Sequence, residues 1–300
     1  MRKIKRIVGI CILSACWMGV LAQTKMPAAR QSSFVKITDK GELQYIPDEK
    51  GNVIPDFSRV GYHHGDKSIP QYTVTKSISP VRGDNWAHIQ KAVDELAKLP
   101  VDANGHRGVL LLKRGIYPVS KSIVIKAGGI VLKGEGSNVN ETRLIATSKE
   151  RYSLIKVVGE GIREEVSGTR VHISQKFVPV GTHSFMVSSA ADYEKGDKII
   201  VYRPGTQKWI HDIQMDRIVE RKGTRQWTPK EYNLAFEREV TKVEGDRIYI
   251  DNPIVMEMEE QYGGGEIYKY IFDGRISEVG ITDLCLESEF EDYEDNNTVG

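Results

Sequence analysis

A single amphipathic helix is predicted between residues 84 and 100. Apolar side chains recur there at i, i+3, i+4, i+7 and i+8, the spacing that gathers side chains on one face of a helix. Asp84 or Asn85 is the expected N-cap, because a short polar side chain accepts hydrogen bonds from the first free N–H groups, and Pro100 ends the pattern. The apolar face consists of Ile89, Ala92, Val93, Leu96 and Ala97.

After this helix the pattern changes to short β-branched runs that glycine residues separate. The gaps are too short for the crossover helix of about a dozen residues that joins parallel strands in a doubly wound sheet. The strands are therefore either antiparallel or parallel and stacked in a coil. The lack of Asn-Gly and Asp-Gly hairpin turns between them favours the coil, in which successive turns stack apolar residues inward. The runs are 109–112, 116–119, 122–125, 130–132, 142–146 and 153–158.

Residues from about 166 to 270 have a different pattern and are predicted to form an inserted β-rich subdomain. Two alternating runs between 239 and 250 flank Glu244-Gly245-Asp246, which predicts a hairpin. Residues 209–218 have helical spacing. From residue 271 the short apolar runs of the coil return.

The N-terminus has the three parts of a secretory signal peptide. A basic segment at 2–6 precedes an apolar run at 7–21, which is shorter than the ~20 residues of a spanning helix, and cleavage is expected before Gln23. We expect export to the periplasm or the cell exterior, with no membrane span after cleavage. A retained membrane anchor and lipid anchoring through Cys16 are the alternatives. The mature chain would keep only Cys285, which excludes an intrachain disulfide and favours a buried structural thiol.

Composition and charge narrow the function classes. The chain has 300 residues, of which 40% are hydrophobic and 28% charged, as in ordinary soluble globular proteins. A net charge of +1 does not favour nucleic acid as a partner.

The expected organisation has five parts. The stacked strands have few turns and no C-terminal cap, although an uncapped end exposes unpaired strand edges and apolar core. We therefore expect the chain to be the N-terminal part of a longer protein. The parts are a signal peptide (1–22), an extended arm (23–75), the helix with the first turns of the coil (76–165), the insert (166–270) and a return to the coil (271–300).

The insert carries one cluster of candidate catalytic residues. Asp212 and Asp216 would share a face if their segment is helical, and glycosidases need two carboxyl groups roughly 5–9.5 Å apart. A lyase instead needs a base and a cation, roles that His211 or Arg203 could fill, with Asp212 as an acid or calcium ligand. The alternative is that these charged residues only cap and solvate the insert. The chain has no Asp-x-Asp-x-Asp loop, so its residues indicate no metal site.

Aromatic side chains are the candidates for sugar binding, because sugar rings stack on aromatic faces. Tyr62, Trp209 and Trp227 are the expected substrate-binding residues, and Trp86 is a further candidate. Packing in the core is the alternative for each of them. The neighbouring pair His63-His64 is interpreted as part of a solvated loop.

Five segments together resemble the pectate-lyase-like superfamily of right-handed parallel β-helices. They are residues 83–85, 88–94, 111–117, 131–136 and 142–145, which follow the order helix, strand ending in Arg-Gly-x-Tyr, strand, Gly-x-Gly, then Thr and an apolar pair. Lys113-Arg114 precedes Gly115, at a position where the family usually has Leu-Pro. The resemblance implies an all-β, right-handed parallel β-helix with an N-terminal capping α-helix.

The resemblance also implies a carbohydrate partner. We expect an exported enzyme that degrades pectin-like or other uronic-acid-containing polysaccharides by β-elimination. A glycoside hydrolase, a non-catalytic glycan-binding or adhesion module, and an inactive fragment stay open as alternatives. No cofactor is evident, and only the resemblance allows Ca²⁺. Fold alone does not select among these reactions.

Overall fold

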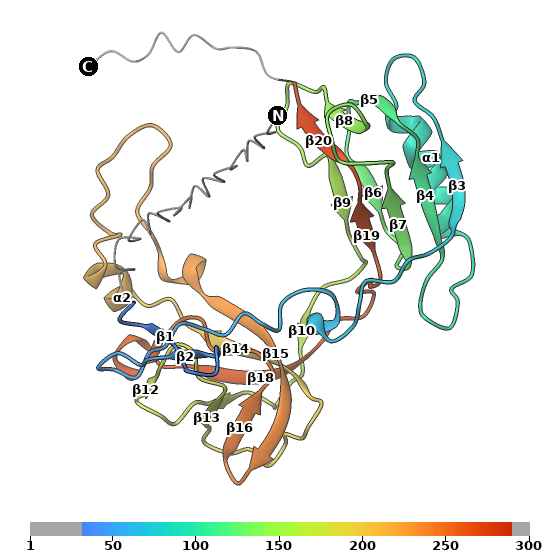
Figure 1. Cartoon of the computed structure of the whole chain (residues 1–300). Coiled ribbons are helices and arrows are strands. Elements are labelled where there is room, and N and C mark those ends of the chain that lie inside the picture. Colours follow the sequence, from blue (N-terminus) through green and yellow to red (C-terminus); the bar gives the residue numbers. More distant parts are fainter. Residues whose placement is uncertain (1–31, 290–300) are drawn as a thin grey trace, which may run out of the picture.

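Short β-strands dominate the chain, which Figure 1 shows as two bodies joined by extended segments. The computed structural model describes residues 32–289. Within this range there are two α-helices and three short 3-10 helices. Strands of the first body pair in parallel, and those of the second pair antiparallel.

The first body consists of three parallel sheets. Consecutive strands β4, β5 and β6 lie in three different sheets, and β7, β8 and β9 each pair with the equivalent strand of this trio. The sheet orders are β19-β7-β4-β3, β20-β8-β5 and β6-β9. The strands are β3 (Val74–Ile78), β4 (Gly108–Leu112), β5 (Gly115–Val119), β6 (Ile123–Ile125), β7 (Ile130–Lys133), β8 (Thr142–Ala146), β9 (Ile155–Val157), β19 (Gly280–Thr282) and β20 (Cys285–Ser288).

Equivalent residues of successive turns fill the interior of this body. Leu110 pairs in register with Leu132, and Tyr117 pairs with Leu144. All four side chains are fully buried. Burying a large apolar side chain stabilises a fold by about 1.5–3 kcal/mol, so each turn gains stability from the turn stacked on it. The predicted strand ladder and its parallel pairing are therefore confirmed.

Helix α1 (Trp86–Ala97) packs against this interior and contacts β3, β4, β6 and β7. Its predicted apolar face is buried, except that Ala97 is only partly buried. Trp86 is not a free aromatic surface, because it packs on the core and its indole N–H donates to the Ser122 carbonyl at 2.9 Å.

The two predicted caps of α1 have different roles. An Asp84 carboxylate oxygen accepts from the backbone N–H of Trp86 at 3.1 Å and from that of Ser120 at 3.0 Å. Asn85 occupies the N-cap position without a side-chain cap bond. Its fully buried side chain instead accepts from the Val81 backbone N–H at 2.8 Å and closes the preceding turn.

The second body is built on an antiparallel sheet in the order β10-β18-β14-β15-β16-β13, with β11 also paired to β18 and a separate β12-β17 pair. The predicted hairpin is confirmed as β15 and β16. The elements are β10 (Glu164–Glu165), β11 (Val171–His172), β12 (Phe177–Val178), β13 (Ser184–Met186), β14 (Lys198–Arg203), α2 (Gln207–Asp212), η2 (Pro229–Tyr232), β15 (Leu234–Glu244), β16 (Arg247–Ile250), β17 (Met258–Glu259), η3 (Glu260–Tyr262) and β18 (Glu266–Ile271).

The second body has a hydrophobic core of its own. Phe185, Val201 and Ile248 are fully buried at its centre. None of its buried residues belongs to the cluster beneath α1, so the two bodies gain stability from separate interiors.

An N-terminal arm runs between the two bodies (Figure 1). It contains the paired strands β1 (Val35–Ile37) and β2 (Leu43–Tyr45) and the 3-10 helix η1 (Tyr62–Gly65). Near the second body, the backbone N–H of Val53 donates to the Val180 carbonyl at 3.0 Å. The arm then continues to β3, which pairs with β4 of the first body.

The chain leaves the parallel body after β9 and returns to it before β19 through two segments in close contact. The backbone N–H of Glu160 donates to the Gly274 carbonyl at 3.0 Å. A Cβ on Gly159 would lie 2.3 Å from that carbonyl oxygen, and one on Gly274 would lie 2.4 Å from the Glu160 oxygen. Glycine is needed here because the two backbones touch.

Several expectations need correction or lie outside the described residues. The signal peptide and Cys16 fall outside residues 32–289. None of the helices in that range has the length and apolar character needed to cross a bilayer. Cys285 is half-buried, and its Sγ lies 3.2 Å from a Glu287 carboxylate oxygen. The helix predicted over 209–218 is shorter, because α2 ends at Asp212 and Gln214 has a left-handed φ of 62°.

A pair of glycine substitutions tests the contact between the leaving and returning segments. Gly274 (φ +82°) and Gly168 (φ +81°) have the same left-handed backbone, but the position of a Cβ is open at Gly168. We expect Gly274→Ala to lower the free energy of unfolding by about 1–3 kcal/mol more than Gly168→Ala does, because only the first creates a clash. Urea unfolding of both variants measures the difference, and equal losses would contradict the contact.

Candidate functional site

Three aromatic side chains lie together beside α2, and we call them the Trp209 cluster. The rings of Trp227 and Tyr232 are stacked, with centroids 3.7 Å apart and an interplanar angle of 13°. The Trp209 ring lies 6.1 Å from Trp227 and 6.5 Å from Tyr232. All three side chains are half-buried, so they offer part of their surface to solvent. The structure therefore brings two of the predicted sugar-binding residues into one surface.

Arg203 lies behind this cluster. Its guanidinium carbon is 4.6 Å from the centre of the Trp209 ring, and its Nε donates to the Glu257 carbonyl at 3.2 Å. The residue is only 3% exposed, and this burial lowers the pKa of its guanidinium. Arg203 is thus placed to support the Trp209 ring, a cation–π contact, rather than to meet a substrate.

His211 and Asp216 form a hydrogen-bonded pair at the surface. His211 Nδ1 lies 2.9 Å from an Asp216 carboxylate oxygen, and this bond holds the pKa of Asp216 below its usual range. The other ring nitrogen, Nε2, lies 3.0 Å from Nη2 of Arg217. Because a guanidinium only donates, Nε2 is the acceptor and Nδ1 carries the proton. A carboxylate that fixes the tautomer of an exposed imidazole is the usual arrangement of a histidine base.

Asp212 has different partners and does not pair with Asp216. Its carboxylate accepts from Lys208 Nζ at 2.6 Å and from the Tyr262 hydroxyl at 2.9 Å, and the Lys208 bond is the main cause of its lowered pKa. The expected carboxyl pair on one helical face is wrong, because the helix ends at Asp212 and Gln214 turns the chain in the left-handed region. The two carboxylates therefore do not line up along one helical face, and each bonds a different set of partners.

Tyr62 lies at a different place, where the arm crosses the parallel body. Its hydroxyl is 2.5 Å from one Glu278 carboxylate oxygen, and His63 Nε2 is 2.8 Å from the other. His63 and His64 are both exposed, as expected of a solvated loop, and His63 in addition bonds Glu278. The bond to Glu278 raises the pKa of Tyr62 to about 12, and the bonds from Tyr62 and then His63 lower the pKa of Glu278.

Beneath this contact lies a cavity of about 370 Å³, which we call the arm cavity. One wall is formed by the arm and the other by β4, β7 and β19. An ion pair at 3.7 Å, between Lys133 and Asp283, closes one side. Its other lining residues include Ile69, Pro70, Tyr72, Val109, Val131 and Ile281.

Sequence reasoning missed Glu278, Lys133 and Asp283, because their partners are distant in the chain. The only local signal is the backbone: Glu278 (φ 57°) and Asp283 (φ 55°) are left-handed, a conformation that is unusual for these residues. The two carboxylates flank β19, are five residues apart in the chain and both line the arm cavity.

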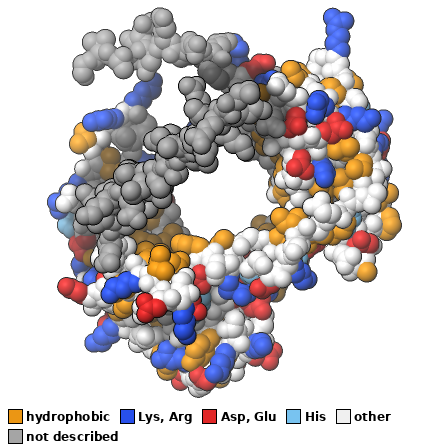
Figure 2. Space-filling view, viewed as in Figure 1, with side chains coloured by type: hydrophobic (Ala, Val, Ile, Leu, Met, Phe, Trp, Pro, Cys, Tyr) orange, Lys and Arg blue, Asp and Glu red, His pale blue; other side chains and the backbone are white. Residues whose placement is uncertain are grey.

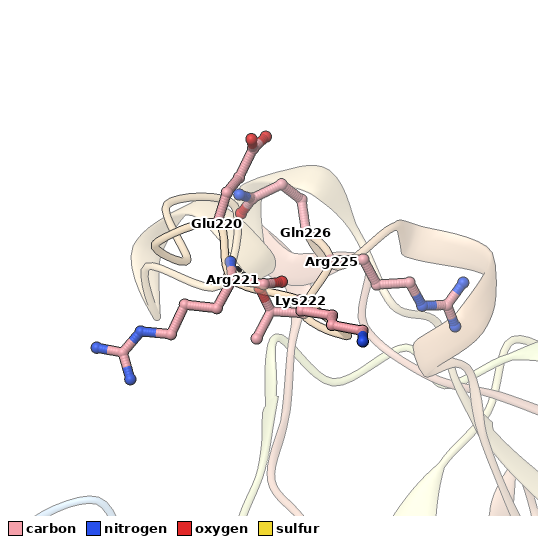
Figure 3. Close-up of a pocket in the computed structure, with 6 residues that line it drawn as sticks. Glu220, Arg221, Lys222, Arg225 and Gln226 are labelled. Atoms are coloured by element: carbon pink, nitrogen blue, oxygen red, sulfur yellow. Dashed lines mark hydrogen bonds between the residues drawn. The ribbon is translucent and has the colours of Figure 1, made fainter. Parts of the chain in front are cut away.

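A second hollow, of about 480 Å³, lies at the tip of the loop that follows α2. Figure 3 shows that its basic side chains do not converge: Arg221 extends to one side of the loop, and Lys222 and Arg225 extend to the other. The hollow is shallow and open to solvent. Because the three basic side chains diverge, one small anion could not contact all of them at once.

Metal ligation has no support from the part of the chain that the structure describes. Residues 32–289 contain no group of three or more His, Cys, Asp and Glu side chains placed to hold a metal ion. Calcium requires six to eight oxygen ligands. The residues of the Trp209 cluster and of the arm cavity do not fit that requirement for Ca²⁺.

Comparison with known proteins gives only slight similarities. No protein-family model and no curated protein sequence matches the chain. Among solved structures, it is similar to a tailspike of Acinetobacter baumannii bacteriophage AP22 in complex with A. baumannii capsular saccharide, with 13% identity and a TM-score of 0.34 over 68% of this chain and 29% of that one.

Two further tailspikes are similar at the same level. The tailspike of Pseudomonas phage phi297 has 15% identity and a TM-score of 0.35 over 69% of this chain and 28% of its own. That of Pseudomonas phage LKA1 has 17% identity and a TM-score of 0.35 over 68% and 27%. The chain thus spans less than a third of each tailspike. Similarities this slight do not assign a function to this chain.

The contact between the arm and Glu278 predicts a pH-dependent stability. Because the fold lowers the pKa of Glu278, its contribution is complete above the ordinary value of 4.5 and is lost as the pH falls below it. Because the fold raises the pKa of Tyr62, that contribution is lost as the pH rises from 10 towards 12. The contact should therefore be strongest between these limits.

We expect Glu278→Gln to lower Tm by about 2–4 °C at neutral pH, and the difference from wild type to shrink below pH 4.5. The same change should speed tryptic cleavage of the arm at the exposed residues Arg59 and Lys67. Glu49→Gln, on an exposed part of the arm, is the control. A Tm difference that does not depend on pH would contradict the role of the Glu278 carboxylate.

Proposed function

We propose that this protein binds and cleaves a uronic-acid-containing polysaccharide outside the cytoplasm, by β-elimination. The proposed scaffold is a right-handed parallel β-helix in which α1 caps the first turn and residues 166–270 form an inserted subdomain. The three parallel sheets support this scaffold, because the turn β4–β6 and the turn β7–β9 each contribute one strand to every sheet. The burial of the α1 face on the same interior supports the cap.

The observation that carries the proposal is the placement of a base, an orienting carboxylate and a cation beside an aromatic surface. His211 is held by Asp216, and Arg217 lies at its second nitrogen. The backbone N–H of Trp227 donates to the Met215 carbonyl at 3.0 Å, which ties the Trp209 cluster to the turn that carries Asp216. Sugar rings stack on exposed aromatic faces, and a uronate carboxylate pairs with a guanidinium.

These groups match the demands of β-elimination. Arg217 would move from His211 to the carboxylate of the bound uronate and neutralise it, which acidifies the proton on C5. The freed Nε2 of His211 then accepts that proton, a C4–C5 double bond forms, and the C4–O4 bond breaks. The departing oxygen takes up a proton from water and becomes the hydroxyl of a new reducing end, and the imidazolium later returns its proton to the resulting hydroxide. Asp216 stabilises the imidazolium that forms, as the carboxylate partners of other histidine bases do.

Glycan binding without cleavage is the second candidate, and one observation favours it. Arg217 occupies the only ring nitrogen of His211 that could act as a base. If Arg217 stays there when a glycan is bound, the cluster serves for recognition alone. A hydrolase has weaker support, because Asp212 bonds Lys208 and Tyr262, Asp216 bonds His211, and neither carboxylate is bonded to the other.

Substitutions at the proposed base test the reaction. We expect His211→Ala to reduce the elimination rate by about 10²–10⁴-fold, the usual contribution of a general base, and Asp216→Asn to reduce it through loss of the correct tautomer. The assay follows the ultraviolet absorbance of the C4–C5 unsaturated product released from polygalacturonate and alginate. Asp192→Asn, an exposed carboxylate elsewhere in the second body, is the control and should retain wild-type activity.

The outcomes separate the candidate functions. New reducing ends without the unsaturated product would indicate hydrolysis. Binding of these polymers without turnover would favour the glycan-binding module. Full activity of His211→Ala would exclude His211 as the base.

A further inference from the structure

The segment between Asp216 and Glu231, which we call the basic loop (217–230), is strongly basic. It carries five cations and one carboxylate, a net charge of +4. The whole chain has a net charge of +1, so everything outside the loop sums to −3. The basic side chains visible at the projecting loop on the left of Figure 2 contrast with the mixed charges elsewhere on that face. The cations are Arg217, Arg221, Lys222, Arg225 and Lys230.

Hydrogen bonds within the loop hold it in a defined shape. The Gln226 side chain accepts from the Ile218 backbone N–H at 2.8 Å and donates to the Ile218 carbonyl at 2.7 Å. The Thr224 hydroxyl accepts from the Arg221 backbone N–H at 2.8 Å. These bonds are local, so they hold the backbone that carries the cations in one shape before any partner arrives, which lowers the entropy that binding must overcome.

The cations at the tip are free to meet a partner. Neither Arg221 nor Lys222 has an ion-pair or hydrogen-bond partner for its side chain within residues 32–289, whereas Arg225 lies 2.7 Å from Glu231. Their side chains diverge (Figure 3), which does not suit a small anion. Divergent cations on a rigid loop suit a long polyanion whose charges are spread along its length.

The loop is continuous with the proposed site at its base. Arg217 contacts His211 at one end of the loop, and Trp227 belongs to the Trp209 cluster at the other. We infer that the basic loop is a charge-selecting arm of this site, which holds an anionic polysaccharide beyond the sugar bound at the Trp209 cluster. The inference rests on the proposed function. Arg221 and Lys222 determine the preference for acidic over neutral glycans.

Nucleic acid is a less suitable polyanion for this surface. Its dense phosphate charge gives an affinity that grows with the number of cations in contact. Here two cations, Arg221 and Lys222, have no ion-pair partner among the described residues. Everything outside the basic loop has a net charge of −3, which repels a densely charged polymer. A polysaccharide with one carboxylate per sugar and apolar ring faces matches both the sparse cations and the aromatic cluster.

A double charge reversal on the full chain tests the inference. The variant Arg221→Glu/Lys222→Glu is compared with Lys91→Glu/Lys126→Glu, which makes the same change in net charge at exposed positions of the first body. Titration calorimetry measures the binding of polygalacturonate and alginate. Methyl-esterified polygalacturonate is the neutral polymer, and an oligodeoxythymidylate is the competing polyanion.

We expect the loop variant to bind polygalacturonate or alginate about tenfold more weakly than wild type, with a smaller dependence on salt. Its affinity for the methyl-esterified polymer should not change, and the control variant should bind like wild type. An equal loss in both variants, no binding of either acidic polymer by wild type, or tighter binding of the oligonucleotide would each overturn the inference. Loss of elimination with retained loop-dependent binding would instead count against the proposed reaction alone.

Discussion

The parallel pairing of β19 with β7 is the constraint on which the rest of the structure depends. Ile281 pairs with Leu132, although the whole antiparallel body lies between them in the chain. This register requires the leaving and returning segments to meet, which they do where Gly159 and Gly274 bring their backbones into contact. This contact holds the second body at one edge of the stacked sheets. The second body packs around a hydrophobic core of its own.

The arm adds a second connection between the bodies. It is bonded to the second body at Val53 and to the segment that precedes β19 at Tyr62. Because Glu278 accepts from both Tyr62 and His63, a single ionised carboxylate fixes the arm over the outer face of β4, β7 and β19. The arm cavity is thus a consequence of tertiary packing, and its charged residues are engaged in the pairs Tyr62–Glu278 and Lys133–Asp283.

The chemistry of the Trp209 surface depends on where one short helix stops. Since α2 ends at Asp212 and Gln214 takes a left-handed conformation, Asp216 returns to bond His211 instead of extending along a helix beside Asp212. The same turn starts the loop that carries Arg217, and the loop closes on Trp227. A longer helix would have separated the imidazole from its carboxylate and from the aromatic cluster.

By itself, the sequence determined the local elements: the α1 face, the glycine-separated strands, the β15–β16 hairpin and the choice of His211 and Asp216 as candidates. Those features follow from side-chain periodicity and turn chemistry within a few residues. Only the tertiary structure decided which carboxylate serves His211, that Arg203 lies buried behind Trp209, and that Tyr62 and His63 meet Glu278. These contacts join residues through helix termination, burial and long-range register, which no local pattern encodes.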